Sequence, residues 1–156
     1  PNSAGFTLGS TNAFTVFDRS WADIPVVQLS LRNDLDPTAH LAAGQALQAL
    51  RQEGVLIIGS GMSFHNMRGY GDAHFTAPSE RFDDWLTQTI ESDSDQRDAA
   101  LRDWSMAPHS LDSHPLGAEE HLLPLMVIAG AAGNDKGTKI YSEQVLKTQL
   151  SAFQFG

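Results

Sequence analysis

Two short apolar runs flank a stretch with helical spacing in the first half of the chain. Residues 24–31 and 55–58 are rich in β-branched and other apolar side chains and have the length of buried strands. Between them, the Asp-Pro pair at 36–37 is typical of a helix start, apolar residues then recur three and four positions apart, and Gly54 is typical of a helix end. Strand, helix and strand over this length predict a βαβ unit whose two strands are parallel.

Helical spacing dominates the second half, and two short strand-like segments close the chain. Residues 66–78 and 108–117 read as irregular loops, and residues 1–22 show no clean period and are also expected to be loop. The remaining expected elements are helices over 79–92, 95–106 and 118–132 and strands over 138–146 and 149–155. We therefore predict one domain over residues 1–156, with an α/β fold in which helices flank a mixed, mainly parallel central sheet.

Charge and composition narrow the function classes. The 156 residues suit a single domain, and their formal net charge of −9 argues against nucleic acid or an anionic membrane as the partner. No apolar run approaches the roughly 18 residues of a transmembrane helix, and no signal-peptide pattern opens the chain, so we expect a cytoplasmic protein. Because the chain has no cysteine, any metal must be held by histidine and carboxylate, which suits Fe(II), Mn(II) or Zn(II).

His65 follows the second apolar run at the place where ligands bind in open α/β sheets. The run at 55–58 leads into a Gly-Ser-Gly segment at 59–61, which lets the backbone bend sharply. An imidazole there suits a general base or a metal ligand, because it titrates near neutral pH. A loop histidine bonded to the backbone is the alternative, and the spacing does not decide between them. His40, on the apolar face of its helix, is expected to be a core histidine.

A second group of metal-binding side chains precedes and opens the helix expected at 118–132. Its histidines and carboxylates are His109, Asp112, His114, Glu119, Glu120 and His121. Pro115 holds His114 extended, and His121 lies on the inward face of the helix, where burial is costly unless the ring is bonded or coordinated. On a helix, the adjacent side chains of Glu120 and His121 point to different faces. A purely structural role for His121 stays open.

Taken together, these motifs resemble one enzyme family. The segment at 59–61, His65-Asn66, His114-Pro115 and residues 120–125 are similar to the class III extradiol ring-cleavage dioxygenases, above all to the aromatic ring-opening, DOPA-type subgroup. The similarity runs from about residue 22 to the end of the chain and concerns the C-terminal portion of such enzymes.

The resemblance implies cleavage of a catecholic ring with O₂ at a single Fe(II), with Zn(II) as the alternative metal. By residue match it implies that His65 is the catalytic acid–base group and also contacts the metal, and that His121 is a metal ligand. It places His114 and Asn66 at the substrate. As partners it implies a small aromatic substrate and O₂, with no nucleic acid and no membrane.

The chain departs from the family at its N-terminal side. Family members supply two further histidine ligands from an N-terminal segment and a pocket histidine in an Asp-His-Gly setting, but the matching stretch at 10–14 has no histidine. We therefore expect an N-terminally incomplete domain with an incomplete metal site, inactive alone. A homo-oligomer or a chain that supplies the missing N-terminal half would then be the protein partner.

Two alternatives compete with this interpretation. The first is a non-catalytic, metal- or partner-binding relative on the same fold, which the missing N-terminal ligands favour. The second is a zinc hydrolase in which His114 and His121 bind the metal and Glu120 is the base.

Overall fold

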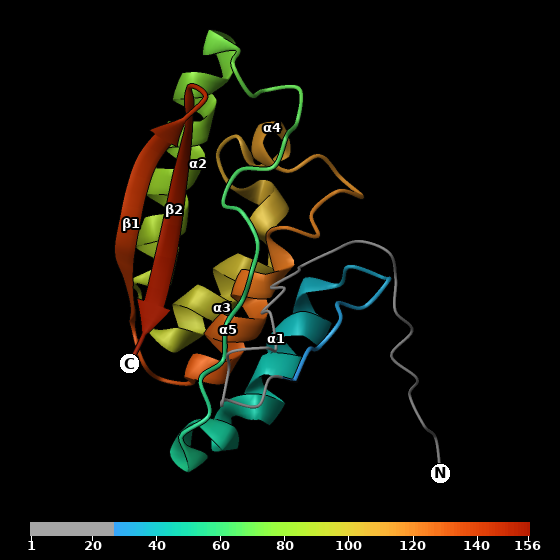
Figure 1. Ribbon diagram of the computed structural model, residues 1–156, viewed down its shortest axis with the longest axis vertical. Helices are drawn as coiled ribbons and strands as arrows, with labels where there is room; N and C mark the ends of the chain where they lie inside the picture. The colour runs from blue at the N-terminus through green and yellow to red at the C-terminus, as the bar shows by residue number, and fades with distance from the viewer. Residues whose placement is uncertain (1–26) are drawn as a thin grey trace, which may run out of the picture.

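Five α-helices and a C-terminal β-hairpin form the described part of the chain, residues 27–156 of a computed structural model (Figure 1). The α-helices are α1 (Pro37–Leu47), α2 (Thr76–Ile90), α3 (Ser94–Arg102), α4 (Ser110–Ser113) and α5 (Leu123–Ala132). The short 3₁₀ helices are η1 (Gln48–Glu53), η2 (Ala73–Phe75) and η3 (Trp104–Met106), and the strands are β1 (Gly137–Val145) and β2 (Thr148–Phe155). Among these residues no helix is both long and apolar enough to reach across a lipid bilayer.

Helix α1 begins where its sequence signal predicts. The side chain of Asp36 accepts a hydrogen bond from the backbone N–H of Thr38 at 3.0 Å, and Pro37 occupies the first turn. This cap satisfies a backbone donor that the helix leaves free, and Pro costs nothing at this position. The predicted helix start is therefore confirmed.

Two glycines allow α1 and α5 to pack backbone against backbone. A Cβ atom at Gly44 would overlap the carbonyl oxygen of Val127, and one at Gly130 would overlap the carbonyl oxygen of Leu41. Figure 1 shows the two helices side by side. Any larger residue at either position would force them apart, so the crossing depends on this pair of glycines.

The hydrophobic core lies between α1, α2, α3 and α5. Its buried residues are Leu41, Phe82, Leu86, Ile90, Leu101, Trp104, Leu122, Leu123, Met126 and Ala129. Burying a large apolar side chain of this kind contributes about 1.5–3 kcal/mol relative to its exposed state. The core therefore fixes α5, and with it the residues that precede α5 in the chain.

The hairpin of β1 and β2 covers one side of α2. The strands pair antiparallel from Gly137 opposite Phe155 to Val145 opposite Thr148, with a bulge after Lys139. The backbone N–H of Gln149 donates to the α2 hydroxyl of Ser79 at 2.9 Å, which ties β2 to the helix. The closing pair of strands expected from the sequence is confirmed.

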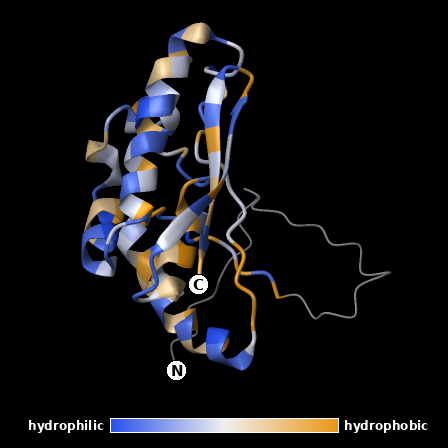
Figure 2. Cartoon of the chain, turned by 90° about the vertical axis from the view of Figure 1, so that its left-hand side faces the viewer, coloured by the Kyte–Doolittle hydropathy of each residue, from blue (hydrophilic) through white to orange (hydrophobic). Residues whose placement is uncertain are grey.

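The expected βαβ unit does not form within the described residues. Residues 27–31 and 55–58 are in no strand, and Val27, Leu56 and Ile58 are 94%, 80% and 62% exposed. The 55–58 stretch is coloured hydrophobic in Figure 2. A strand exists only when a neighbour pairs with its backbone, and within residues 27–156 neither run has such a neighbour.

The sheet prediction therefore needs correction. Within residues 27–156 the sheet consists of two antiparallel strands, so a mainly parallel central sheet is not confirmed, whereas the mixture of helix and strand is. The loop expected over residues 1–22, the stretch at 10–14 and residues 24–26 of the first apolar run all lie outside the described residues.

Arg97 on α3 is a fully buried cation that holds the C-terminal end of α5. Its guanidinium donates to the carbonyl oxygens of Ala129, Gly133 and Asp135 at 2.8–2.9 Å. It also lies 5.3 Å from the centre of the Phe155 ring. These bonds satisfy carbonyls that the end of a helix leaves without partners, so one side chain joins α3, α5 and β2.

Replacing Arg97 with methionine is expected to lower the free energy of unfolding by about 3–5 kcal/mol, because several buried carbonyls lose their donor. Equilibrium urea unfolding measures this loss. The control is Arg102→Met on the same helix, where the side chain is exposed and a change below about 0.5 kcal/mol is expected. Equal losses in both variants would show that the buried hydrogen bonds contribute nothing beyond a general arginine effect.

Candidate metal centre

The extended segment after residue 58 lies directly against the start of α5. A Cβ atom at Gly61 would overlap the carbonyl oxygen of His121, and one at Gly59 would lie 2.7 Å from the carbonyl oxygen of Pro124. The backbone N–H of Met62 donates to the carbonyl oxygen of His121 at 3.0 Å. The glycines are needed because only a residue without a side chain allows this approach, which carries the following residues toward His121.

Three hydrogen bonds then fasten residues 63–66 to residues 112–114. The backbone N–H of His65 donates to the carbonyl of Ser113 at 2.9 Å, and the amide of Asn66 donates to the carbonyl of Asp112 at 2.9 Å. In the third, Nε2 of His114 lies 3.0 Å from the carbonyl oxygen of Ser63. The backbone that carries His65 is therefore held on both sides of the residue.

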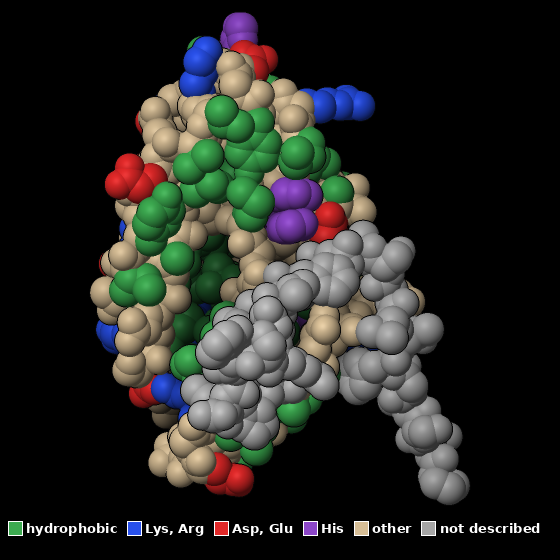
Figure 3. All heavy atoms as spheres, viewed as in Figure 1, with side chains coloured by type: hydrophobic (Ala, Val, Ile, Leu, Met, Phe, Trp, Pro, Cys, Tyr) green, Lys and Arg blue, Asp and Glu red, His purple; other side chains and the backbone are tan. Residues whose placement is uncertain are grey.

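His65, Glu120 and His121 form a compact cluster of metal-binding side chains. One ligand atom from each lies within 4.8 Å of the others. The two imidazole rings are stacked with their centres 3.5 Å apart, and Nδ1 of His65 lies 3.9 Å from Oε1 of Glu120. Figure 3 shows a pair of adjacent histidines beside an acidic side chain on this face of the molecule, as these distances describe.

The cluster keeps the imidazole of His65 unprotonated. Burial and the neighbouring His121 lower the pKa of His65, and Glu120 offsets part of this effect. Within residues 27–156, the buried Nδ1 of His65 has no hydrogen-bond partner. A buried nitrogen without a partner is costly, and a cation beside it would relieve that cost. Two imidazoles and one carboxylate are also the donor set of non-haem Fe(II) sites, so these residues fit a divalent metal.

The sequence predicts a role for Glu120 only as the base of a zinc hydrolase, and it predicts that Glu120 and His121 point to different faces of a helix. In the structure residues 120–122 form a turn, and α5 begins only at Leu123. Pro124 in the first turn suits such a late start, since its ring needs no helical hydrogen bond there. Glu120 and His121 are therefore free to converge. The helix start expected at residue 118 is wrong, and Pro124 is the sequence signal that favours the later start.

His114 lies behind the cluster. Its ring is fully buried, with edge-on contacts to Phe82 at 5.6 Å and Trp104 at 6.1 Å between centres. Because its Nε2 faces a carbonyl oxygen, that nitrogen carries the proton, and Nδ1 is left without a partner within residues 27–156. The expected contact between His114 and substrate stays a prediction. The zinc hydrolase alternative loses support, because the cluster of ligand atoms found within residues 27–156 joins His121 to His65 and Glu120 and does not include His114.

The other candidate residues are engaged in local contacts. The amide oxygen of Asn66 accepts from the backbone N–H of Arg68 at 3.1 Å, and its expected role at the substrate stays a prediction. His40 is buried, with Nδ1 2.7 Å from the carbonyl of Asp36 and Nε2 accepting from the backbone of Arg32, so its interpretation as a core histidine is confirmed. His109 pairs with Asp112 at 2.8 Å, away from the cluster.

Acidification is expected to destabilise the fold through His114. Burial lowers the pKa of His114 to about 4, so the unfolded chain, with a pKa near 6.5, binds this proton more readily. The contribution is fully present above about pH 6.5 and is lost as the pH falls toward 4. Between pH 7 and pH 5 the free energy of unfolding should fall by about 2 kcal/mol from this group, as urea unfolding at both pH values would measure.

The variant His114→Gln should show a smaller loss between the two pH values, because its buried side chain does not titrate. His74→Gln is the matched control, since the His74 side chain is 92% exposed. An unchanged pH dependence in His114→Gln would contradict the assignment.

Comparisons with known proteins agree on one family. Residues 15–154 match the family described as the catalytic LigB subunit of aromatic ring-opening dioxygenase. The chain is 34% identical over 151 residues to "Dioxygenase tasH" of Hapsidospora irregularis, covering 88% of this chain and 46% of that protein. It is 40% identical over 128 residues to "4,5-DOPA dioxygenase extradiol" of Beta vulgaris, covering 78% and 45%.

One solved structure has a similar fold. The crystal structure of an uncharacterized protein from Escherichia coli K12 superposes with a TM-score of 0.67 at 28% identity, covering 86% of this chain and 56% of that one. The chain thus spans about half the length of the curated relatives that it matches.

Proposed function

This chain belongs to the LigB family of aromatic ring-opening dioxygenases, the class III extradiol enzymes, and on that premise we propose that it is the C-terminal, metal-binding part of an enzyme that opens a catecholic ring with O₂. The convergence of His65, Glu120 and His121 is the observation that carries the proposal. Within residues 27–156 it is the group of His and carboxylate side chains whose ligand atoms lie close enough to share one cation.

The three side chains have different proposed roles, which follow from their chemistry. We assign His121 and Glu120 as metal ligands, with Fe(II) as the native metal and Zn(II) as the alternative. These residues would hold the metal, and Fe(II) bound there would supply the activation of catechol and O₂. His65 lies against the His121 ring and borders the same space, so we assign it to act on the substrate.

His65 is the residue that accepts a proton from the catechol hydroxyl. Its lowered pKa keeps the ring neutral near pH 7, and a neutral imidazole is the form that accepts a proton. The hydrogen bonds from residues 63–66 to residues 112–114 hold its backbone in place, so the base does not need to be ordered when substrate arrives.

We assign the remaining parts of the site to the part of the relatives that lies outside the region matched by this chain. Because the chain spans about half of its curated relatives, we propose that further ligands come from an N-terminal half, joined to this chain or separate. Homo-oligomerisation and a cytoplasmic location stay predictions.

Oxygen uptake tests the proposal. The native protein that contains these residues is loaded anaerobically with Fe(II), and catechol, protocatechuate or L-DOPA is added in an oxygen-electrode cell. We expect uptake with at least one of them and a new visible absorbance from the opened ring, with none in the Zn(II)-loaded control. Full iron occupancy without uptake on any catechol would contradict the enzyme and favour the non-catalytic relative.

A further inference from the structure

The peptide bond that precedes His65 is held at both of its ends. Its N–H group, which belongs to His65, donates to the carbonyl oxygen of Ser113 at 2.9 Å. Its carbonyl oxygen, which belongs to Phe64, accepts a hydrogen bond from the hydroxyl of Tyr70 at 2.8 Å. Because a peptide unit is planar, fixing both ends fixes the direction in which the His65 side chain leaves the backbone.

A tight turn brings Tyr70 back to this peptide. The backbone N–H of Gly69 donates to the carbonyl oxygen of Asn66 at 2.8 Å, which reverses the chain directly after His65. The rings of Phe64 and Tyr70 then meet edge to face, with 5.6 Å between their centres. Phe64 is buried in this contact, so the residue before His65 is held by its side chain as well as by its carbonyl group.

The hydroxyl of Tyr70 is the donor in its bond to Phe64. A carbonyl oxygen only accepts hydrogen bonds, and burial raises the pKa of Tyr70, so the phenol keeps its proton across the neutral range. The hydroxyl also lies 3.7 Å from Sδ of Met62, a weak acceptor that competes little with a carbonyl oxygen.

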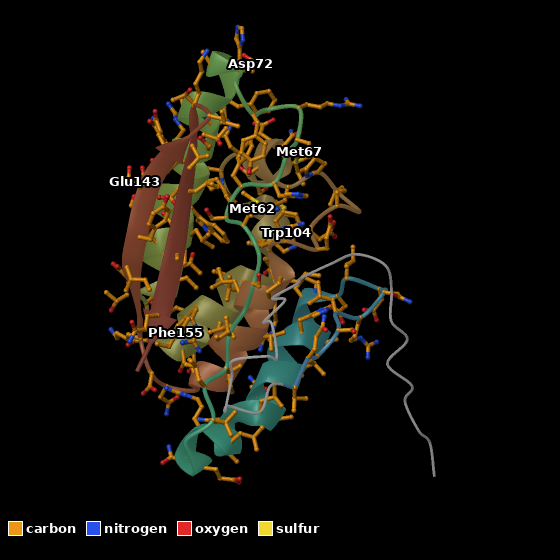
Figure 4. The ribbon with its side chains drawn as sticks, in the orientation of Figure 1. Met62, Met67, Asp72, Trp104, Glu143 and Phe155 are labelled. Atoms are coloured by element: carbon orange, nitrogen blue, oxygen red, sulfur yellow. The ribbon has the colours of Figure 1, made fainter. Side chains whose placement is uncertain are left out.

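The β-hairpin anchors the chain beside Tyr70. The backbone N–H of Gly71 donates to the carbonyl oxygen of Leu146, in the turn between β1 and β2, at 2.7 Å. Figure 4 shows the chain running from Met67 to Asp72, toward the end of the molecule where the hairpin turns. Tyr70 is therefore tied to the hairpin on one side and holds the peptide before the candidate base on the other.

We propose that Tyr70 is a positioning residue for His65, which acts by fixing the peptide unit from which the imidazole extends. This inference rests on the proposed role of His65 as the base of ring cleavage. Without the Tyr70 hydroxyl the imidazole is still present, but its backbone has lost one of two anchors. The ring then spends less time in the geometry that accepts the catechol proton.

The first test is Tyr70→Phe, which removes the hydroxyl and keeps the ring. The native protein that contains these residues is loaded with Fe(II), and oxygen uptake is followed with a catechol that the unchanged protein cleaves. We expect kcat to fall about tenfold, with KM and bound iron changed by less than about twofold. Tyr141→Phe is the matched control, because Tyr141 is 46% exposed on β1 and its hydroxyl should be dispensable.

A double-mutant cycle shows whether Tyr70 acts through His65. Tyr70→Phe is combined with His65→Gln, which leaves no base to position. We expect the added change to slow His65→Gln by less than about twofold, because two residues that act as one unit are not additive. A tyrosine that only stabilises the fold would instead cause the same loss in both backgrounds.

Amide exchange tests the geometry without the reaction. In the metal-free chain, with no catechol present, Tyr70→Phe should raise the exchange rate of the His65 amide at least about threefold, as nuclear magnetic resonance would measure. The amide of Gln149, which donates to Ser79 on the far side of the hairpin, is the internal control and should exchange at an unchanged rate.

Three results would overturn the proposal: an unchanged kcat in Tyr70→Phe, an equal loss in both backgrounds, or an unchanged exchange rate of the His65 amide. If the unchanged protein takes up oxygen and Tyr70→Phe does so equally fast, this inference fails alone. If the unchanged protein takes up none with any catechol, the proposed function fails first, and the positioning of a base fails with it.

Discussion

Replacing His65 with alanine is expected to lower catechol turnover roughly 10²–10⁴-fold while leaving bound iron nearly unchanged. The imidazole is held unprotonated by burial beside His121, and its Nδ1 has no partner within residues 27–156. Alanine removes the proton acceptor but leaves His121 and Glu120 in place. Turnover is measured by oxygen uptake in the native, iron-loaded protein, and iron by elemental analysis of the same sample.

Two further variants separate loss of a base from general damage. His65→Gln keeps a polar side chain of similar reach but accepts no proton at neutral pH, so it should be nearly as slow as His65→Ala. His74→Ala changes a histidine whose side chain is 92% exposed and should retain turnover. If His65→Ala loses its iron as completely as a His121 variant, His65 is a metal ligand and the division of roles is wrong.

The local elements were predictable because their causes are local. The Asp36–Pro37 cap, the apolar spacing of α2 and the closing hairpin each depend on neighbours within a few residues, and all are present in the structure. A strand at 55–58 is a different kind of claim, because its hydrogen bonds must come from elsewhere. The sequence shows the apolar run but not the partner, and within residues 27–156 the run stays unpaired and exposed.

In the candidate site, too, the features with local causes were predictable and those that depend on distant residues were not. Residue types and motif similarity singled out His65 and His121, and the structure stacks their rings at 3.5 Å. The position of Glu120 depends on the turn at 120–122, which periodicity alone places inside a helix. The burial of His114 depends on Phe82 and Trp104, residues from other elements that no local pattern connects to it.

Removal of His121 is expected to cause the largest loss of metal affinity. His121 and Glu120 are the proposed ligands, so His121→Ala leaves the carboxylate as the one assigned donor, with His65 beside it. Loss of groups that only support a ligand already costs about 10–100-fold in affinity, so loss of a ligand should exceed about 100-fold. Glu120→Gln should weaken binding less, because the amide keeps one oxygen donor but removes the charge that a dication favours.

The measurement uses this chain and Zn(II), which binds the same donor types and is insensitive to air. Competition titration against a chelator gives the affinity of each variant. His109→Ala is the control, because His109 pairs with Asp112 away from the cluster and its removal should leave the affinity within about twofold. Retained affinity in His121→Ala would place the metal elsewhere. It would also leave the stacked rings of His65 and His121 without a cation to explain why two imidazoles and a carboxylate converge at low solvent exposure.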